Sequence, residues 1–460
     1  MPDSHRLPLP ALLWPALTML LVLLVLLALL TSPAWGHTAL VRASPAAGSV
    51  LQGSPETVVL VFSEPVEVLG VSLRDPQGRE LPVTARASAE TVEVTIPHSK
   101  AHGTWLLDWR VAAADGHPVG GTLDYSIGNT STQDAAAHGA TATAAHPWRS
   151  GAIWLARWLT WLGLFAVVGA GLFRTMAPEQ HVGPAGAMVA ATVVLLVIDL
   201  GLQGLDLLDA PASAAFTMLP WQQALGSSYA LTLGCMALAL AAAWPAMHAP
   251  GGSRQKSWTI VALLLVGVSA MLSGHVGTAP PQWLTRPLVT LHVALAVAWF
   301  GCLIPLVLLL RADLAGQARV GPALARFSRW IAPAVGLLVL SGIGLASRQL
   351  SGPPDLLQTA YGRVLLVKLI LVACLLGLAA INRWRNTRPA LAGEPDAKRR
   401  LVRVTRLELV LAIALLAVVS VWRLTPPPRS LVVQEVKTAI GVLSSDIEPL
   451  WIQARLSSTH

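Results

Sequence analysis

The stretch that decides the fold of most of this chain is Leu291-His292-Val293-Ala294-Leu295-Ala296-Val297-Ala298-Trp299-Phe300-Gly301. It lies in an apolar run, residues 286–310, that exceeds the ~20 residues a helix needs to cross a bilayer. Seven similar runs accompany it, so the sequence predicts an all-α polytopic membrane domain of eight transmembrane helices over residues 151–424. The expected spans are 151–173, 187–208, 229–247, 257–273, 286–310, 329–347, 362–383 and 405–424.

The composition agrees with a membrane protein. Hydrophobic residues make up 54% of the 460 residues, charged residues only 12%, and the mean hydropathy is +0.60. The net charge of +8 is unevenly placed, because fourteen lysines and arginines fall in the predicted cytoplasmic loops and two in the outer loops. This asymmetry predicts that both chain ends lie outside the cytoplasm. It also accounts for the basic balance, so no nucleic-acid partner is expected.

The amino terminus reads as a secretory signal peptide, residues 1–36. Arg6 precedes an apolar core, Ala11–Leu30, and the small residues Ala34 and Gly36 precede the expected cleavage point. Cleavage there makes His37 the first residue of the mature protein. A terminal histidine offers an α-amine and an imidazole that together chelate a metal ion. The alternative is an ordinary terminus that happens to begin with histidine.

Residues 37–128 predict an all-β sandwich, Ig-like or cupredoxin-like, because short β-branched and alternating runs are separated by Gly, Pro and Asp turns. The runs cover 57–62, 66–73, 91–96, 105–111 and 122–127. The domain has no cysteine, so any metal there is held by nitrogen and oxygen atoms. Residues 129–150 follow as an Ala-, Thr- and Gly-rich flexible linker. Residues 425–460 are expected to form a periplasmic tail.

A second polar cluster in this domain is Asp115-Gly116-His117-Pro118. In an extended segment, residues i and i+2 face the same side, so Asp115 and His117 are able to converge on one ion. Pro118 biases His117 away from helical conformations. The alternative is a turn with a solvated aspartate and histidine.

Three blocks of the soluble part, in this order, resemble CopC-type copper-binding proteins. They are His37-Thr38-Ala39-Leu40-Val41-Arg42-Ala43-Ser44-Pro45-Ala46-Ala47-Gly48-Ser49, Val61-Phe62-Ser63-Glu64-Pro65-Val66 and Trp109-Arg110-Val111-Ala112-Ala113-Ala114-Asp115-Gly116-His117-Pro118-Val119-Gly120-Gly121. The resemblance implies a periplasmic β-sandwich that binds Cu(II) through the α-amine and imidazole of His37, the imidazole of His117 and the carboxylate of Asp115. Such a ligand set suits tetragonal Cu(II). Some members also bind Cu(I) through methionines, which this chain lacks between His37 and Met176.

The membrane part resembles CopD-type copper resistance proteins. The resemblance rests on Leu291–Gly301, Arg326-Phe327-Ser328-Arg329, Leu340-Ser341-Gly342, Tyr361-Gly362-Arg363-Val364-Leu365-Leu366-Val367-Lys368 and Asn382-Arg383. It implies copper movement across the bacterial inner membrane, usually inferred to be uptake. Fusions of the two domains belong to the family's pattern.

Polar residues inside membrane spans are functional candidates because burying them in lipid is costly. Met271, His275 and His292 fall at similar depth in the outer half of the membrane and suggest a copper path, with methionine favouring Cu(I). The alternative is a pair of histidines that hydrogen-bond between helices. Asp199 leads a polar stripe on the second span and is expected to pair with Lys368 or to line a pathway.

Together these features predict a multi-pass inner-membrane protein that captures Cu(II) in the periplasm and passes copper inward, and that is not an enzyme. No nucleotide-binding motif is visible, so transport requires a gradient or a downstream sink. One alternative is a copper chaperone or sensor that serves oxidase assembly through other periplasmic copper proteins. Another is a histidine-brace copper oxidase, although Asp115 as a fourth ligand would blunt such chemistry.

Overall fold

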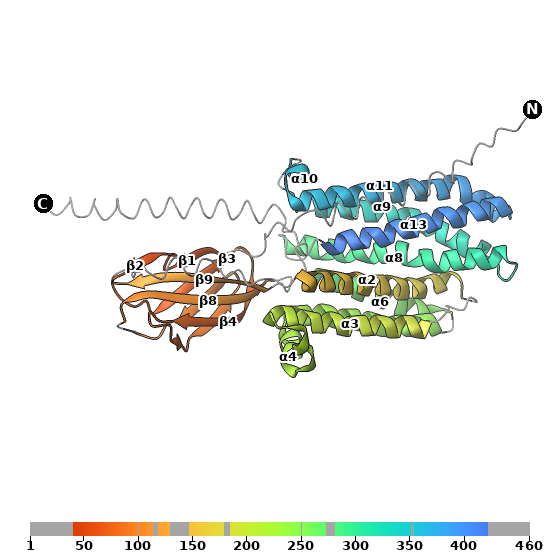
Figure 1. Cartoon of the computed structure of the whole chain (residues 1–460). Helices are drawn as coiled ribbons and strands as arrows, with labels where there is room; N and C mark the ends of the chain where they lie inside the picture. Colours follow the sequence, from red (N-terminus) through yellow and green to blue (C-terminus); the bar gives the residue numbers. More distant parts are fainter. Residues whose placement is uncertain are drawn as a thin grey trace, which may run out of the picture.

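The computed structural model describes residues 40–99, 101–113, 118–128, 147–178, 185–249, 251–272, 281–350, 352 and 354–421. The predicted signal peptide, the tail 425–460 and most of the predicted linker lie outside these ranges. The described chain forms a β-sandwich and a bundle of long helices, which lie end to end (Figure 1).

The sandwich consists of two sheets, as the alternating sequence pattern predicts. One sheet has the strand order β1-β3-β7-β6 and the other β2-β9-β8-β4-β5. The strands are β1 Leu40–Ser44, β2 Ser49–Leu51, β3 Thr57–Phe62, β4 Val66–Arg74, β5 Glu80–Leu81, β6 Thr84–Ser88, β7 Thr91–Thr95, β8 Gly103–Ala113 and β9 Pro118–Ile127.

The core of the sandwich follows from the period of two in β8. Trp105, Leu107, Trp109 and Val111 are all buried, and the residues between them are more exposed. The Trp109 ring meets Phe62 of the opposite sheet edge to face, with 5.1 Å between ring centroids. Large aromatic side chains therefore join the two sheets.

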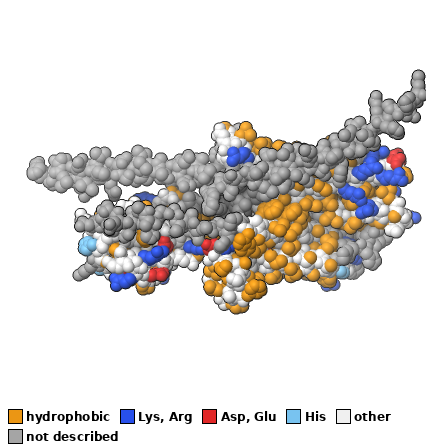
Figure 2. Space-filling view, in the orientation of Figure 1, with side chains coloured by type: hydrophobic (Ala, Val, Ile, Leu, Met, Phe, Trp, Pro, Cys, Tyr) orange, Lys and Arg blue, Asp and Glu red, His pale blue; other side chains and the backbone are white. Residues whose placement is uncertain are grey.

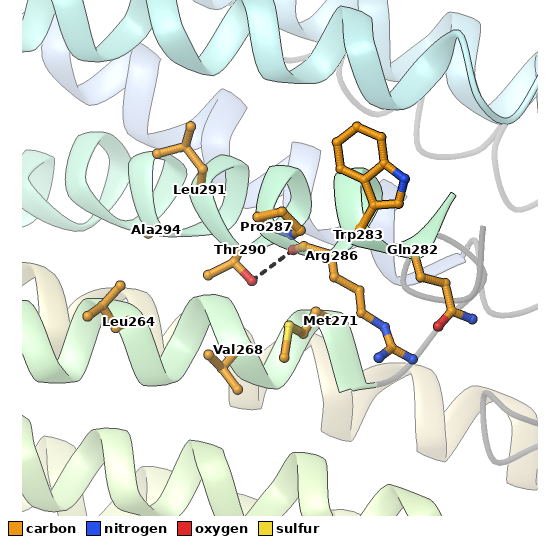
Figure 3. A pocket seen from close by; sticks show the side chains of 10 residues that line it. All are labelled: Leu264, Val268, Met271, Gln282, Trp283, Arg286, Pro287, Thr290, Leu291 and Ala294. Atoms are coloured by element: carbon orange, nitrogen blue, oxygen red, sulfur yellow. Dashed lines mark hydrogen bonds between the residues drawn. The ribbon is translucent and has the colours of Figure 1, made fainter. Parts of the chain in front are cut away.

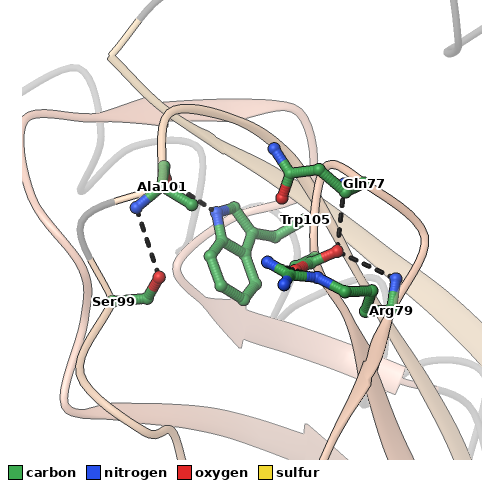
Figure 4. A network of polar contacts seen from close by, with 6 residues as sticks. Gln77, Arg79, Ser99, Ala101 and Trp105 are labelled. Carbon is green, nitrogen blue, oxygen red and sulfur yellow. Dashed lines mark hydrogen bonds and ion pairs between the residues drawn. The ribbon is translucent and has the colours of Figure 1, made fainter.

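The β4–β5 turn is closed by one carboxylate (Figure 4). Asp75 accepts hydrogen bonds from the backbone N–H groups of Gln77 and Arg79, at 3.0 and 2.9 Å, and from Arg79 Nε at 2.9 Å. Such side-chain-to-backbone bonds are the reason why aspartate favours turns. Nearby, the Trp105 indole donates to the carbonyl of Ala101 at 3.4 Å.

The second part is helical. Its elements are α2 Pro147–Met176, α3 Ala185–Leu208, η1 Ala212–Phe216, α4 Met218–Gly226, α5 Ser228–His248, α6 Ser253–Leu272, α8 Gln282–Leu314, α9 Gly321–Ala346, α10 Asp355–Gln358, α11 Ala360–Ile381, the π-helical turn η2 Asn382–Asn386, α12 Thr387–Leu391 and α13 Pro395–Val421.

Seven helices within the described ranges are long and apolar enough to cross a membrane. The expected eighth span corresponds to α13, which packs on α8 and α11 but is not among the seven. Its amino-terminal half differs from theirs because it carries Lys398, Arg399, Arg400, Arg403 and Arg406. On the face drawn in Figure 2, hydrophobic side chains cover the middle of the bundle and basic ones gather at the end away from the sandwich.

Helices α2 and α8 touch through backbone at one crossing. A Cβ atom added to Gly169 would lie 2.2 Å from the carbonyl carbon of Gly301, and one added to Gly301 would lie 2.3 Å from the Phe165 oxygen. Small residues permit such close approach in membrane helices. This contact fixes the distance between the first membrane helix and the longest one.

We expect Gly169→Val to destabilise the bundle, because the new side chain has no space at this crossing. Overpacking of this kind costs ~1–3 kcal/mol or more. Gly234→Val on α5 is the matched control, since nothing lies within 4 Å of a Cβ there. The measurement is the melting temperature of the two purified variants in detergent. Equal melting temperatures would contradict the close contact between α2 and α8.

Candidate metal centre

One end of the sandwich gathers the strand ends that flank the predicted metal ligands. Leu40, the first residue of β1, pairs with Phe62, the last residue of β3. After three further residues β4 begins at Val66, which pairs with Ala113, the last residue of β8. β9 then begins at Pro118, beside the end of β8. The start of β1 and the β8–β9 connection therefore share this end, which we call the hairpin end.

The predicted ligands themselves, His37, Asp115 and His117, lie outside the described residues. The structure does describe the residues next to them in the chain. Leu40 follows His37 by three residues, and Ala113 and Pro118 lie on either side of the segment that contains Asp115 and His117. Within the described ranges, no group of three or more His, Cys, Asp or Glu side chains is arranged to hold a metal ion.

A glycine next to the hairpin end has a clear packing role. Gly121 on β9 pairs with Trp109, and a Cβ atom at this position would lie 2.6 Å from the indole ring. The bare backbone therefore lets the buried indole lie across β9. This explains one glycine of the sequence motif without assigning it to a metal.

Two arginines contact the carboxyl end of α3, and Arg110, which lies in the sandwich, joins the sandwich to the bundle there. Arg110 of β8 donates from Nη2 to the carbonyl of Asp206 at 3.0 Å. Arg149, in the first turn of α2, forms a 2.5 Å ion pair with Asp209 and donates to the Ala210 carbonyl at 2.7 Å. The last carbonyls of a helix lack helical partners and carry partial negative charge, so the Arg110 guanidinium caps α3, while Arg149 holds the residues that follow the helix.

This contact orients the sandwich. Arg110 lies three residues before Ala113, so the hairpin end faces the ends of α2 and α3 (Figure 1). Burial lowers the pKa of the Arg110 guanidinium, while the carboxylates of Asp209 and Asp206 act in the opposite direction. The group stays charged at neutral pH, because an unperturbed arginine pKa exceeds 12. Neither Arg110 nor Arg149 was among the residues singled out from the sequence.

Met271 lines a groove between α6 and α8 (Figure 3). The groove has a volume of about 580 Å³, and its walls on α8 include Thr290, Leu291 and Ala294. Among the residues that line the groove, Arg286 is the charged one. His275, predicted to lie close to Met271, falls outside the described residues.

His292 faces the other way, toward α9. Its Nδ1 lies 3.1 Å from the Leu338 carbonyl and 3.0 Å from Ser341 Oγ, and that hydroxyl donates to the same carbonyl at 2.9 Å. A carbonyl oxygen only accepts, so Nδ1 carries the proton and Nε2 keeps a free lone pair. For Nε2 the described structure gives no partner. The charge of Lys368 on α11 acts electrostatically on the same ring.

The structure therefore does not bring Met271 and His292 together. Met271 lies in the α6–α8 groove, whereas the His292 ring bonds to α9. The sequence predicts similar depths for the two residues. However, Met271 lies against one face of α8, and the His292 side chain leaves α8 from another. A single path through both residues is not supported by this arrangement.

Asp199 has a different partner from the one predicted. Asp199 Oδ1 lies 3.6 Å from Arg157 Nε on α2, and Tyr229 donates to Oδ2 at 2.9 Å. Arg157 also donates to Gln203 at 3.0 Å and lies 4.1 Å from the centre of the Tyr229 ring. Asp199 thus pairs with Arg157 and Tyr229 in place of the expected Lys368. A charge inside the first apolar run was the available signal for Arg157.

Two family models match the chain. The CopC domain matches residues 40–128, and "Copper resistance protein D" matches residues 321–422. Copper resistance protein C of Xanthomonas campestris pv. juglandis is 31% identical over 117 residues, which cover 91% of that protein and 23% of this chain. The chain belongs to the CopC/CopD copper resistance family.

The chain is also similar to a longer relative and to a solved structure. "Copper transport protein CutJ" of Bacillus subtilis is 24% identical over 438 residues, 89% of this chain and 77% of that protein. The crystal structure of CopC from Methylosinus trichosporium OB3b matches 21% of this chain and 96% of its own, at 28% identity and a TM-score of 0.19. The residues that match the CopC domain form the sandwich, and the residues that match CopD begin at α9.

We expect Arg110→Ala to leave the sandwich folded but to loosen its contact with α3. A hydrogen bond to a charged group contributes ~1.5–3 kcal/mol, so amide exchange at residues 205–210 should accelerate about tenfold or more. Arg86→Ala, which changes an exposed arginine on β6, is the control. Equal exchange in both variants, measured by hydrogen–deuterium exchange mass spectrometry, would show that Arg110 does not hold the two parts together.

Proposed function

We propose that this protein captures Cu(II) in the periplasm at the hairpin end of the sandwich and passes copper to its membrane domain for import across the inner membrane. The observation that carries this proposal is the direction of the hairpin end, which faces the ends of α2 and α3 and is held there by the Arg110 bond to the Asp206 carbonyl. An ion released there has a short way to travel to the bundle.

The capture site consists of the α-amine and imidazole of His37, the carboxylate of Asp115 and the imidazole of His117. Three residues of chain reach at most ~11 Å, so His37 stays near Leu40 at the hairpin end. The β8–β9 strands, paired as far as Ala112 and Pro118, end on either side of the segment that carries the other two ligands. Three nitrogens and one oxygen suit Cu(II), and no thiolate is available in this domain.

The orientation follows from charge. The amino end of α2 and the carboxyl end of α3 lie beside the sandwich, and basic side chains gather at the opposite end of the bundle (Figure 2). Cytoplasmic loops are enriched in lysine and arginine, which supports a periplasmic sandwich. Capture on that side favours inward transport.

Within the membrane, His292 is the residue best prepared to bind copper. The Leu338 carbonyl and Ser341 hydroxyl hold the Nδ1 proton, so the ring presents Nε2 as a ligand atom. Second-shell hydrogen bonds fix the tautomer of metal-binding histidines in this manner. Met271 belongs to a separate groove and is not part of this proposed step.

Insertion of one alanine before His37 should lower Cu(II) affinity by about 100-fold or more, because the α-amine then leaves the chelate ring; 100-fold corresponds to ~2.7 kcal/mol. The measurement is a competitive copper titration of the full-length processed protein, after mass spectrometry confirms a terminus at His37. His98→Ala, an exposed loop histidine, is the control and should bind normally. Unchanged affinity of the extended protein would remove His37 from the site.

His292→Ala should abolish copper movement into proteoliposomes, and Ser341→Ala should slow it by about tenfold, since a lost second-shell partner costs roughly 10–100-fold. Ser347→Ala, an exposed serine at the end of α9, is the control. Normal transport by His292→Ala would exclude the intramembrane ligand. In cells, unchanged copper uptake with reduced oxidase activity on deletion of the gene would instead support a chaperone.

A further inference from the structure

A second cavity, of about 330 Å³, lies among α8, α9, α11 and α13. Its walls are mainly apolar, with Trp299 and Leu306 from α8 and Phe327 and Ile331 from α9. Its polar lining comes from Ser328, Asn382, Arg383, Thr387, Thr405 and Glu408. These polar groups gather near the junction of α11 with η2, the end that carries the basic residues of the predicted cytoplasmic loop.

Glu408 is the carboxylic acid of this cavity and is only 3% exposed. Asn382 Nδ2 donates to Glu408 Oε1 at 3.1 Å and lies 3.2 Å from Thr405 Oγ1. Asn386 donates in turn to Asn382 Oδ1 at 2.9 Å. No ion pair to Glu408 occurs in the described part of the chain. A buried carboxylate held only by neutral groups differs from the paired Asp199.

The charged surroundings of Glu408 are simple. From α8, Trp299 and Leu306 face the cavity, and from α9 Ser328 does so. η2 contributes Arg383, the other charged group of the lining, whose guanidinium donates to the Oγ and carbonyl oxygen of Ser328. Arg383 is therefore held by α9 and leaves the Glu408 carboxyl without a bonded cation.

The backbone beside Glu408 is irregular. Asn382–Asn386 forms a π-helical turn, and Thr387 Oγ1 donates to the Asn382 carbonyl at 2.7 Å. Such turns insert a residue into a helix and recur at functional sites. Here the turn places Asn382 against Glu408.

The cavity also aligns with His292. Trp299 follows His292 by seven residues, two helical turns, so both lie on the same face of α8 about 10 Å apart along its axis. His292 bonds to α9, and Trp299 lines the cavity beside α9. The outer ligand and the inner carboxyl thus belong to the same group of helices.

We propose that Glu408 is a proton-exchange site that couples copper movement to proton movement, an inference that rests on the proposed transport function. A copper cation that enters the cavity stabilises the ionised carboxylate, so the Glu408 proton leaves to water. When the ion departs, the carboxylate takes up a proton again. The exchange needs no nucleotide and involves no change in copper oxidation state.

The test uses the full-length protein in detergent and in proteoliposomes, with Cu(II) as the probe. Glu408→Gln preserves the acceptor for Asn382 but removes the titrating group. We expect it to release about one proton fewer per Cu(II) bound than the wild type, and to lose the dependence of copper flux on an imposed pH difference. Glu408→Asp retains a carboxyl group and should keep both properties.

The control is Glu394→Gln, an exposed glutamate in the turn before α13. Infrared difference spectra on Cu(II) addition should show loss of a protonated carboxyl band in the wild type and none in Glu408→Gln. Wild-type-like proton release and flux in Glu408→Gln would overturn the inference while leaving copper transport intact. Absence of copper flux in the wild type, with the carboxyl band still responding, would instead reject the transport function.

Discussion

The arrangement of the whole protein depends on the cap of α3. Arg110 of β8 donates to the Asp206 carbonyl in the last turn of this helix, and Arg149 of α2 binds Asp209 and the Ala210 carbonyl just after it. A helix end at a membrane surface needs such partners, because its last carbonyls have none within the helix. The Arg110 bond that caps α3 therefore also attaches the sandwich and directs its hairpin end toward the bundle.

Local sequence patterns were sufficient to predict the two architectures. The alternation in β8 and the length of the apolar runs depend on neighbours within one strand or helix, so they are readable along the chain. The contacts of Asp199 are not readable in this manner. Its partner, Arg157, lies on another helix, and depth in the membrane was equally compatible with Lys368. Packing between helices selected one partner.

His292 and Met271 illustrate the same limit. Hydropathy gives the depth of a residue in the bilayer, but each successive residue turns about 100° around the helix. Leu291 lies in the Met271 groove, and His292, one residue later, bonds to α9. Which helix lies beside each face is a property of the bundle, so the sequence predicted a candidate ligand and missed its surroundings.

The polar groups inside the bundle divide into two kinds. Around α2, α3 and α5, Arg157 and Asp199 neutralise each other and also meet Gln203 and Tyr229. Breaking a buried ion pair is costly, so this cluster is suited to holding the helices that carry the sandwich. Around α8, α9, α11 and α13, within the part of the chain that the structure describes, His292 Nε2 has no partner and Glu408 accepts only from a neutral donor. Groups with unused bonding capacity can exchange an ion or a proton without disrupting the fold. The same physical criterion therefore separates the helices that hold the sandwich from those that we propose to carry copper.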